Sequence, residues 1–327
     1  MATIVNLMVD SPTTVKCNTT QSVTTSTVAN YDIETRCKEF LMLLKDKSEV
    51  ESFIFFTDPH LAEFTGWESN YVKYINALHK AYNSTPTSYV VCGGDWLGHS
   101  DTKDYACFKL TYIDDTMKTM FDNYYHVVGN HDTNYQGKLS EDAEIRTGTL
   151  GNEVICNLWF KDKRKAYYYF DGTVTRNYVL DTQLDVTDTT MDDYKWLQLD
   201  WLATELLKND LPHSAIYMHI AFINDSNDFS EMAINLGKII SAYNNRITVV
   251  LNDRTYDFTK CSGRIDYILS GHIHRDYSAL LGGVNCIATT WMRDGKTPSF
   301  DLCFSDYDNR KLYMIRVGTG KNRLFDF

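Results

Sequence analysis

The sequence of 327 residues predicts an α/β fold in which helices cover a parallel sheet. Between residues 53 and 132, short apolar runs typical of buried strands alternate with segments whose apolar residues recur at helical spacing. These apolar runs end at Asp, Asn or His side chains, and ligands of open α/β sheets bind beyond the carboxyl ends of the strands. We therefore expect a polar site along one edge of the sheet.

Five predicted strands share one design, an apolar run that stops at a side chain able to bind a metal ion. They cover residues 53–56, 89–92, 125–128, 215–218 and 265–269. The polar residues that follow them are, in chain order, Asp58, His60, Asp95, Asn130, His131, Asp132, His219, His272 and His274. We expect the five strand ends to surround a single site.

Helices are expected before and between these strands. The apolar spacing predicts them over residues 31–47, 69–82, 105–121, 190–202 and 231–243, with Ser69 as the N-cap of the second. Between residues 133 and 165 the pattern loosens, which suits either a substrate-facing insertion or a surface excursion without contact to substrate.

The remaining apolar segments predict further strands. Residues 166–170 and 177–180 form two of them, and Asp181 after the second is expected to be structural rather than a metal ligand. Four short alternating segments near the end of the chain, residues 278–281, 284–288, 300–304 and 312–317, are typical of hairpins.

Composition is that of a globular protein, with 43% hydrophobic and 23% charged residues. Because the candidate ligands span most of the chain, residues 31–327 are predicted to form one catalytic domain. Residues 1–30 are rich in Thr, Ser and Val and are expected to be a β appendage, a linker or the edge of a longer natural chain, such as a surface or phage-borne protein.

A net charge of −11 argues against an extended nucleic-acid or anionic-membrane surface, since such surfaces need clustered Lys and Arg. No run has the length of a membrane-spanning helix and no signal peptide is evident, so a cytoplasmic location is expected. The eight cysteines lack Cys-x-x-Cys spacing, which leaves reduced thiols and some disulfide as alternatives. The oligomeric state stays open.

The motifs form an ordered series: Asp-x-His at Asp58, Gly-Asp at Asp95, Gly-Asn-His-Asp at residues 129–132, a lone His219, and Gly-His-x-His at residues 271–274. This series resembles the calcineurin-like metallophosphoesterase superfamily over about two thirds of the chain. Each block alone is a weak signal, but five in order at predicted strand ends are specific. The resemblance implies a four-layer α/β/β/α sandwich, in which the later strands and hairpins close a second mixed sheet.

The resemblance also implies two divalent or mixed-valence metal ions. Asp58, His60 and His274 would hold the first ion, Asn130, His219 and His272 the second, and Asp95 would bridge the two. Mixed oxygen and nitrogen ligands suit Mn, Fe, Zn or Ni better than Ca.

The implied activity is hydrolysis of a phosphomonoester or phosphodiester by a metal-bound hydroxide. His131 would be the general acid, with Asp132 as the local candidate to orient it. Asn130, His99 and Arg275 are candidates for contacts with the substrate, although Arg275 also fits a solvated or ion-paired residue.

Two departures from the family's motifs argue against particular activities within it. Trp96-Leu97-Gly98 follows Asp95 in place of the Asp-Arg-Gly of Ser/Thr protein phosphatases, and Asp132 stands where those enzymes carry Glu. The iron-binding Tyr of purple acid phosphatases is absent from the second block. The alternative function is a catalytically silent metal-site scaffold that binds other proteins, and retention of His131 argues against it. The substrate, whether nucleotide, sugar phosphate, lipid headgroup or cyclic diester, stays undecided.

Overall fold

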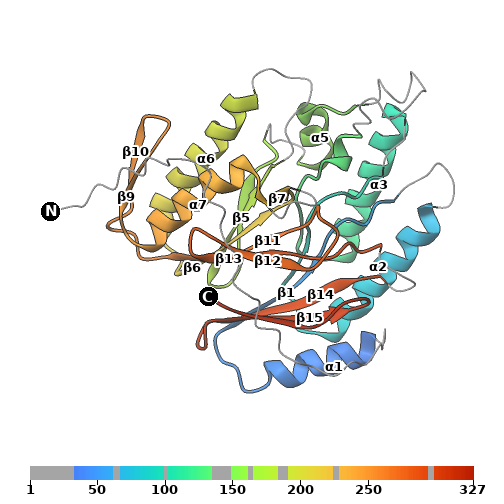
Figure 1. Ribbon diagram of the computed structural model, residues 1–327. Coiled ribbons are helices and arrows are strands. Elements are labelled where there is room, and N and C mark those ends of the chain that lie inside the picture. The colour runs from blue at the N-terminus through green and yellow to red at the C-terminus, as the bar shows by residue number, and fades with distance from the viewer. Residues whose placement is uncertain are drawn as a thin grey trace.

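The computed structural model describes most of the chain, and the structural statements below concern its described residues. These are residues 33–61, 67–98, 102–134, 149–160, 165–182, 191–223, 228–293 and 298–327. Two six-stranded sheets lie face to face with helices outside them (Figure 1). The predictions for residues 1–30 and for His99 lie outside the described part.

The first sheet has the strand order β16-β15-β14-β1-β2-β3. Its strands are β1 (Val50–Phe56), β2 (Tyr89–Cys92), β3 (Tyr124–His126), β14 (Phe300–Asp306), β15 (Lys311–Val317) and β16 (Arg323–Asp326). The strands β1, β2 and β3 are parallel, whereas β14, β15 and β16 continue the sheet in antiparallel fashion from β1.

The second sheet has the order β12-β13-β11-β6-β5-β4 and is also mixed. Its strands are β4 (Tyr168–Asp171), β5 (Thr175–Leu180), β6 (His213–Met218), β11 (Arg264–Ser270), β12 (Tyr277–Leu281) and β13 (Val284–Ala288). The four central strands are parallel, and the two edge strands β4 and β12 run antiparallel to their neighbours.

Helices cover the outer face of each sheet, which confirms the predicted four layers. Figure 1 shows α1 (Ile33–Leu44), α2 (Trp67–Ser84) and α3 (Lys103–Met120) on one side and α6 (Met191–Lys208) and α7 (Glu231–Asn244) on the other. The strand β1 is buried on both faces, as parallel strands of such sandwiches are. Ile54 and Phe56 pack under the helices, while Phe53 and Phe55 pack between the sheets.

The order of the sheets corrects one prediction. The hairpin-like segments at residues 300–304 and 312–317 were expected to close the second sheet, but they form β14 and β15 of the first. The strand β14 pairs with β1, from Val50 opposite Asp306 to Phe55 opposite Asp301. An alternating pattern predicts a strand, but it does not identify a partner that lies almost the length of the chain away.

Some boundaries and small elements also differ from the predictions. The helix α2 begins at Trp67, so Ser69 lies in its first turn and is not the N-cap. The strand β3 ends at His126, two residues before the predicted end. The helix α5 (Asn152–Trp159) lies in the loosely patterned segment, and sequence reasoning also missed the hairpin of β9 (Thr248–Leu251) and β10 (Arg254–Asp257) and the short pair β7 (Phe222–Ile223) and β8 (Asp228–Phe229).

Two further expectations can be compared with the structure. No helix in the described part of the chain is both long and apolar enough to cross a membrane. Seven of the eight cysteines are described, and all seven are free thiols, most of them buried.

Candidate metal centre

Five strands from both sheets bring their carboxyl ends to one place. Asp58 and His60 follow β1, Asp95 follows β2, Asn130 and His131 follow β3, His219 follows β6, and His272 and His274 follow β11. The loops are joined by backbone hydrogen bonds, among them Asp58 N to Gly94 O at 2.9 Å and His60 N to Asp95 O at 3.0 Å. The predicted convergence of the seven candidate ligands is therefore present.

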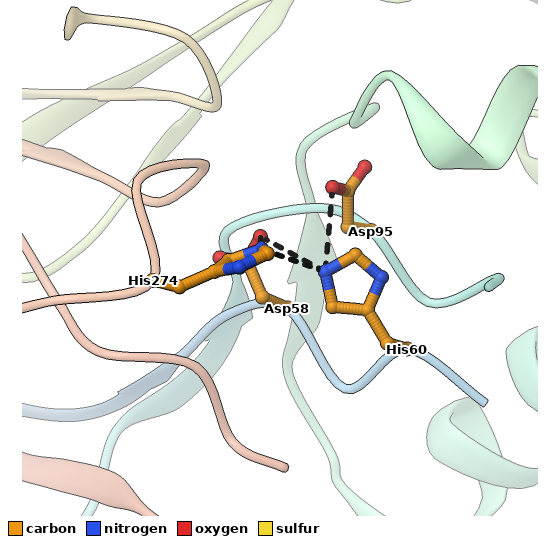
Figure 2. A group of neighbouring side chains, drawn as sticks. All are labelled: Asp58, His60, Asp95 and His274. Carbon is orange, nitrogen blue, oxygen red and sulfur yellow. Dashed lines mark hydrogen bonds and ion pairs between the residues drawn. The ribbon is translucent and has the colours of Figure 1, made fainter. Parts of the chain in front are cut away.

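One group of donors consists of Asp58, His60, Asp95 and His274, whose donor atoms lie within 4.8 Å of one another. Figure 2 shows these four side chains pointing toward one another, with Asp58 and His60 on one loop and Asp95 and His274 on two others. His274 Nε2 lies 2.9 Å from His60 Nε2 and 3.2 Å from Asp58 Oδ1. Imidazole nitrogens and carboxylate oxygens at such spacing can bind one transition metal ion.

A second group consists of Asp95, His219 and His272 and uses the same Asp95. His219 Nε2 lies 3.0 Å from Asp95 Oδ2. The amide oxygen of Asn130 lies 3.1 Å from His219 Nε2 and 2.9 Å from His272 Nδ1, which adds a fourth donor. Asp95 is therefore the residue that the two groups share.

The carboxylates leave two oxygens for a cation. Asp58 Oδ2 accepts hydrogen bonds from the Thr57 hydroxyl and the His272 amide, and Asp95 Oδ1 accepts one from the His131 amide. Asp58 Oδ1 and Asp95 Oδ2 are buried and accept no hydrogen bond from the described residues. Burying an anionic oxygen without a partner is costly, so these two atoms fit cation ligands.

The imidazole of His219 gives a further reason why the site fits cations. Its Nδ1 lies 2.7 Å from the carbonyl oxygen of Gly93, which can only accept, so Nδ1 carries the hydrogen. Nε2 then faces Asp95 and Asn130, both of which are acceptors, so this atom needs either a proton or a bond to a cation. Burial by itself would lower the pKa of His219, but the Asp95 carboxylate outweighs burial and raises the pKa to about 10. The position thus attracts positive charge.

The carboxylate of Asp58 also depends on its neighbours. Burial acts to raise its pKa, but the nearby imidazoles of His274, His60 and His219 outweigh burial and hold the pKa well below the usual range. For Asp95, the charge of His219 likewise outweighs burial and lowers the pKa. Both carboxylates are therefore kept anionic although neither is exposed to solvent.

Backbone strain is concentrated at the candidate ligands. Asp58, His60, Asp95, His272 and His274 have φ values of 54°, 43°, 60°, 74° and 53°. The left-handed region costs a non-glycine residue about 1–3 kcal/mol, and such strain gathers at functional sites. Because five strained residues surround one point, the rest of the fold must offset the cost of holding these donors in a fixed arrangement.

Two glycines of the motifs are required by close approach. A Cβ at Gly129 would lie 2.1 Å from Asp95 Oδ1, and a Cβ at Gly271 would lie 2.0 Å from Thr57 Oγ1. Any side chain at either position would push a candidate ligand loop aside. The glycines of Gly-Asn-His and Gly-His-x-His are thus explained by packing against the carboxylate loops.

The sequence comparison agrees with this geometry. The sequence model of the calcineurin-like phosphoesterase family matches residues 52–276, more than half of the chain. The chain belongs to this family. The resemblance drawn from the motifs is confirmed, and the matched region contains all seven candidate ligands of the phosphoesterase.

The chain is similar to solved structures at low sequence identity. A dimetal phosphatase from Danio rerio is 13% identical with a TM-score of 0.56, and the match covers 86% of this phosphoesterase and 100% of that chain. GAP50 from Plasmodium is 10% identical with a TM-score of 0.49, and the match covers 82% of this chain and 84% of that one. A putative 5′-nucleotidase from Staphylococcus aureus is 13% identical with a TM-score of 0.41, and the match covers 85% of this chain and 54% of that one. The first supports the fold of the phosphoesterase. None of the curated proteins compared matches the chain.

Asp132 makes contacts that its sequence position did not predict. Its carboxylate accepts hydrogen bonds from the backbone amides of Asp95 (3.0 Å), Leu97 (3.1 Å) and Gly129 (2.9 Å). Burial, together with the nearby Asp95 charge, raises the pKa of Asp132 to about 7. Asp132 therefore joins the second and third motif blocks, and its role in orienting His131 stays a prediction.

The other predicted site residues lie as follows. His131 Nε2 is 3.9 Å from Asp95 Oδ2, and its ring centroid is 4.4 Å from that of His60. Arg275 is exposed on the surface directly after His274. Most of the segment 133–165 and His99 lie outside the described residues, so the structure leaves their predicted contacts with substrate open.

Sequence reasoning missed three residues that support the site. Thr57 donates to Asp58, and Thr290 donates its hydroxyl to the carbonyl oxygen of His274 at 3.0 Å. Trp291 stacks on the imidazole of His274, with ring centroids 4.6 Å apart and 17° between the planes. The proximity of Thr57 to Asp58 in sequence could have suggested the first contact, but no spacing rule connects Thr290 or Trp291 to the last motif.

Proposed function

We propose that this phosphoesterase is a metal-dependent hydrolase of phosphoric esters with a binuclear centre. Asp58, His60 and His274 would hold one ion, Asn130, His219 and His272 the other, and Asp95 would bridge them. Mn, Fe, Zn and Ni suit these nitrogen and oxygen donors. The observation that carries the proposal is that two groups of donors share Asp95. The Oδ2 atom of Asp95 is buried and accepts no hydrogen bond from the described residues.

Bound ions would activate a water molecule and neutralise the charge on the phosphoryl oxygens. The chain itself contributes a rigid set of donors. Their strained backbone and the hydrogen bonds from Thr57 and from the amides of His131 and His272 fix the carboxylates before any ligand arrives. Such preorganisation means that little reorganisation is needed when the ester binds.

His131 is proposed as the general acid. In hydrolysis a water oxygen forms a new bond to phosphorus, the bond to the leaving oxygen breaks, and that oxygen takes up a proton. The His131 amide is tied to Asp95 at 2.7 Å, which holds the residue beside both donor groups. Its side chain is 17% exposed, so a leaving group at the edge of the centre could reach the imidazole.

The exposure of the donors supports one direction of approach for the ester. The side chains of Asp58 and His219 are fully buried, that of His60 is 5% exposed and that of His274 is 35% exposed. The centre is thus closed toward the sheets and open on the side of His274 and His131. Asn130, Arg275 and His99 are retained as proposed contacts for phosphate oxygens on the open side.

The test is restoration of activity by metal ions. Protein stripped of metal is assayed with p-nitrophenyl phosphate and bis-p-nitrophenyl phosphate after addition of Mn, Ni, Zn, Fe or Mg. Hydrolysis that depends on added metal is expected, and the ratio of the two rates would separate monoesterase from diesterase. The variant His131→Ala should hydrolyse both esters more slowly, with little change in metal binding.

The opposite result would favour the scaffold function. If the protein binds two ions per chain but hydrolyses no ester in a broad panel, the hydrolase proposal is wrong, and the centre would serve a protein-binding module. If it binds no ions, the assignment of both donor groups is wrong.

A further inference from the structure

Trp291 lies at the open side of the metal centre. It follows β13, and its indole packs against His274. The side chain of His274 is 35% exposed, more than those of Asp58, His60 and His219. The ring also lies edge-on to His60, with centroids 6.2 Å apart. An ester that approaches the donors from the open side therefore meets this indole.

The backbone around Trp291 is fixed. The Met292 amide donates to the carbonyl oxygen of Thr57 at 2.8 Å, next to Asp58. On the other side, the Thr290 amide donates to Asp276 and the Thr290 hydroxyl to the His274 carbonyl. Met292 itself is fully buried and anchors the segment. The indole is thus held by the same loops that carry the candidate ligands.

Burial separates Trp291 from the tryptophans of the core. Trp67, Trp96 and Trp159 are at most 2% exposed, and each donates its indole N–H to a protein acceptor. Trp291 remains partly exposed although it stands beside deeply buried donors. One face of its ring packs on His274, and the residue keeps some exposed surface beside the donors.

Positive charge lies close to the indole. The guanidinium of Arg293 is 6.0 Å from the Trp291 ring centroid, and the Arg293 side chain is exposed. In a chain with a net charge of −11, a cation at the open side would favour an anionic ester over a neutral one. The combination of a flat apolar ring and a cation suits an organic group that is planar and attached to phosphate.

We propose that Trp291 is a stacking platform for the organic group of the ester. The preferred substrates would then carry a planar aromatic ring, either close to the ester oxygen or separated from it by a sugar, as in nucleoside phosphates. This inference rests on the proposed hydrolase function and adds the substrate class. Stacking of a base on an aromatic side chain contributes about 1–3 kcal/mol, which corresponds to roughly 5- to 150-fold in kcat/KM.

Two pairs of substrates isolate the aromatic ring. Benzyl phosphate and cyclohexylmethyl phosphate have similar size and both release a primary alcohol. A nucleoside 5′-monophosphate and ribose 5-phosphate form the second pair and differ by the base. For each pair, the ratio of kcat/KM for the aromatic member to that for the other member is measured in the metal-restored enzyme. The pair with the higher ratio identifies the position of the ring.

Substitutions at Trp291 then test the origin of the preference. Trp291→Leu should lower the aromatic ratio about 5- to 150-fold through a higher KM for the aromatic ester. Trp291→Phe keeps a ring and should retain much of the preference. Trp196→Leu is the matched control, because Trp196 packs on the outer face of the second sheet and should leave the ratio unchanged.

Two readouts exclude a purely structural role. Trp291→Leu should require the same concentration of added Mn for half-maximal activity as the wild type. Calorimetry with benzylphosphonate and cyclohexylmethylphosphonate, which have no ester bond to hydrolyse, should show weaker binding of the benzyl compound alone. An equal loss for aromatic and non-aromatic compounds, or a raised Mn requirement, would mean that Trp291 only supports His274 and would overturn the inference.

The outcomes also separate this inference from the proposed function. Hydrolysis of all four esters with no aromatic preference, and no change in the ratio on substitution, would reject the stacking platform and leave the hydrolase intact. No metal-dependent hydrolysis of any ester would reject the hydrolase itself. Arg293→Met should weaken both members of each pair alike, because charge acts on the phosphate and not on the ring.

Discussion

Two clusters of charge lie side by side in this phosphoesterase and differ in how their charges are balanced. In the metal centre, the ion pairs of Asp58 and Asp95 among the described residues are all with histidine, and one oxygen of each carboxylate accepts no hydrogen bond there. The second cluster, here called the arginine cluster, consists of Arg316, Arg323, Asp276 and Asp301.

The arginine cluster contains its own cations. Arg316 is fully buried and donates to both oxygens of Asp301, to Asp276 and to the carbonyl oxygen of Thr319. Burial alone would lower the pKa of Arg316, but Asp301 and Asp276 outweigh burial and raise it. Two guanidinium groups thus face two carboxylates, and the cluster needs no external ion.

The contrast shows how a fold can distinguish a structural charge cluster from a binding site. The arginine cluster is compensated by the chain's own cations, whereas the two carboxylates of the candidate metal centre form no ion pair with Lys or Arg among the described residues. The two are connected, since Asp276 accepts from Arg316 and from the amide of Thr290, and the Thr290 hydroxyl donates to the carbonyl of His274. The arginine cluster therefore braces the last ligand loop.

The largest expected effect is on catalysis. Asp95→Asn removes the charge that both donor groups share while keeping the shape of the side chain. Each 1.4 kcal/mol of lost transition-state stabilisation is about tenfold in rate, so loss of the several kcal/mol supplied by a bridged centre should lower kcat/KM on the order of a thousandfold or more. The circular dichroism spectrum should be unchanged. Asp200→Asn, in the ion pair with Arg254 on the surface, is the control and should retain full activity.

An unchanged rate in Asp95→Asn would remove Asp95 from the centre. Loss of the folded signal together with activity would leave the comparison undecided for this residue, and Asp58→Asn is then measured in the same way.

The next effect concerns stability. Arg316→Met leaves the buried Asp301 without its main cation, and breaking a buried ion pair from one side costs about 3–5 kcal/mol in the free energy of unfolding. Urea unfolding at neutral pH measures it. Arg254→Met removes an exposed ion pair and should cost less than about 1 kcal/mol. Equal losses in the two variants would contradict the distinction between a structural cluster and the surface.

Addition of metal ions tests whether the metal centre is stabilised by cations from solution. An ion at 100 times its Kd stabilises the folded state by about 2.7 kcal/mol when it binds only the folded chain. Mn or Zn should therefore raise the Tm of metal-stripped protein, measured by calorimetry. The increase should be much smaller in Asp95→Asn and should persist in Arg254→Met. A Tm that does not respond to any transition metal would argue that the centre compensates its own charge.

The smallest expected effect comes from another buried carboxylate, that of Glu51 on β1. Its side chain is buried, and Oε1 has no hydrogen-bond donor among the described residues. Burial raises the pKa of Glu51 above its ordinary value, although hydrogen bonds from Val174, Thr175 and Tyr89 offset part of the increase. Unlike Asp58, which follows the same strand, Glu51 forms no ion pair with a histidine among the described residues, so its carboxyl keeps a proton to higher pH than an ordinary glutamate does.

The sign of the pH dependence follows from this shift. A carboxyl group with a raised folded-state pKa contributes stability below its unfolded pKa and loses it as the pH rises through the folded-state value. Glu51→Gln stays neutral, so its free energy of unfolding relative to the wild type should increase between pH 5 and pH 8 by about 1–3 kcal/mol. Urea unfolding at the two pH values checks this. A difference that is constant with pH would mean that Glu51 titrates normally.

The sequence by itself determined the strands that carry the site and the chemistry of the donors. Apolar runs with a Gly, Asp, Asn or His at their ends are local features, and their order was enough to identify the family and the two sandwiched sheets. The types of donor, imidazole with carboxylate and amide, likewise follow from residue identity. These properties depend on neighbours within a few positions of the chain, which is why pattern and spacing could predict them.

The tertiary structure alone decided the contacts between distant segments. It placed β14 beside β1, turned the Asp132 carboxylate toward the amides of Asp95, Leu97 and Gly129, and set Trp291 against His274. It also formed the arginine cluster from β14, β15, β16 and the loop after β11. No local pattern encodes these contacts, because each depends on how the whole chain packs its layers and on which buried charges then require a partner.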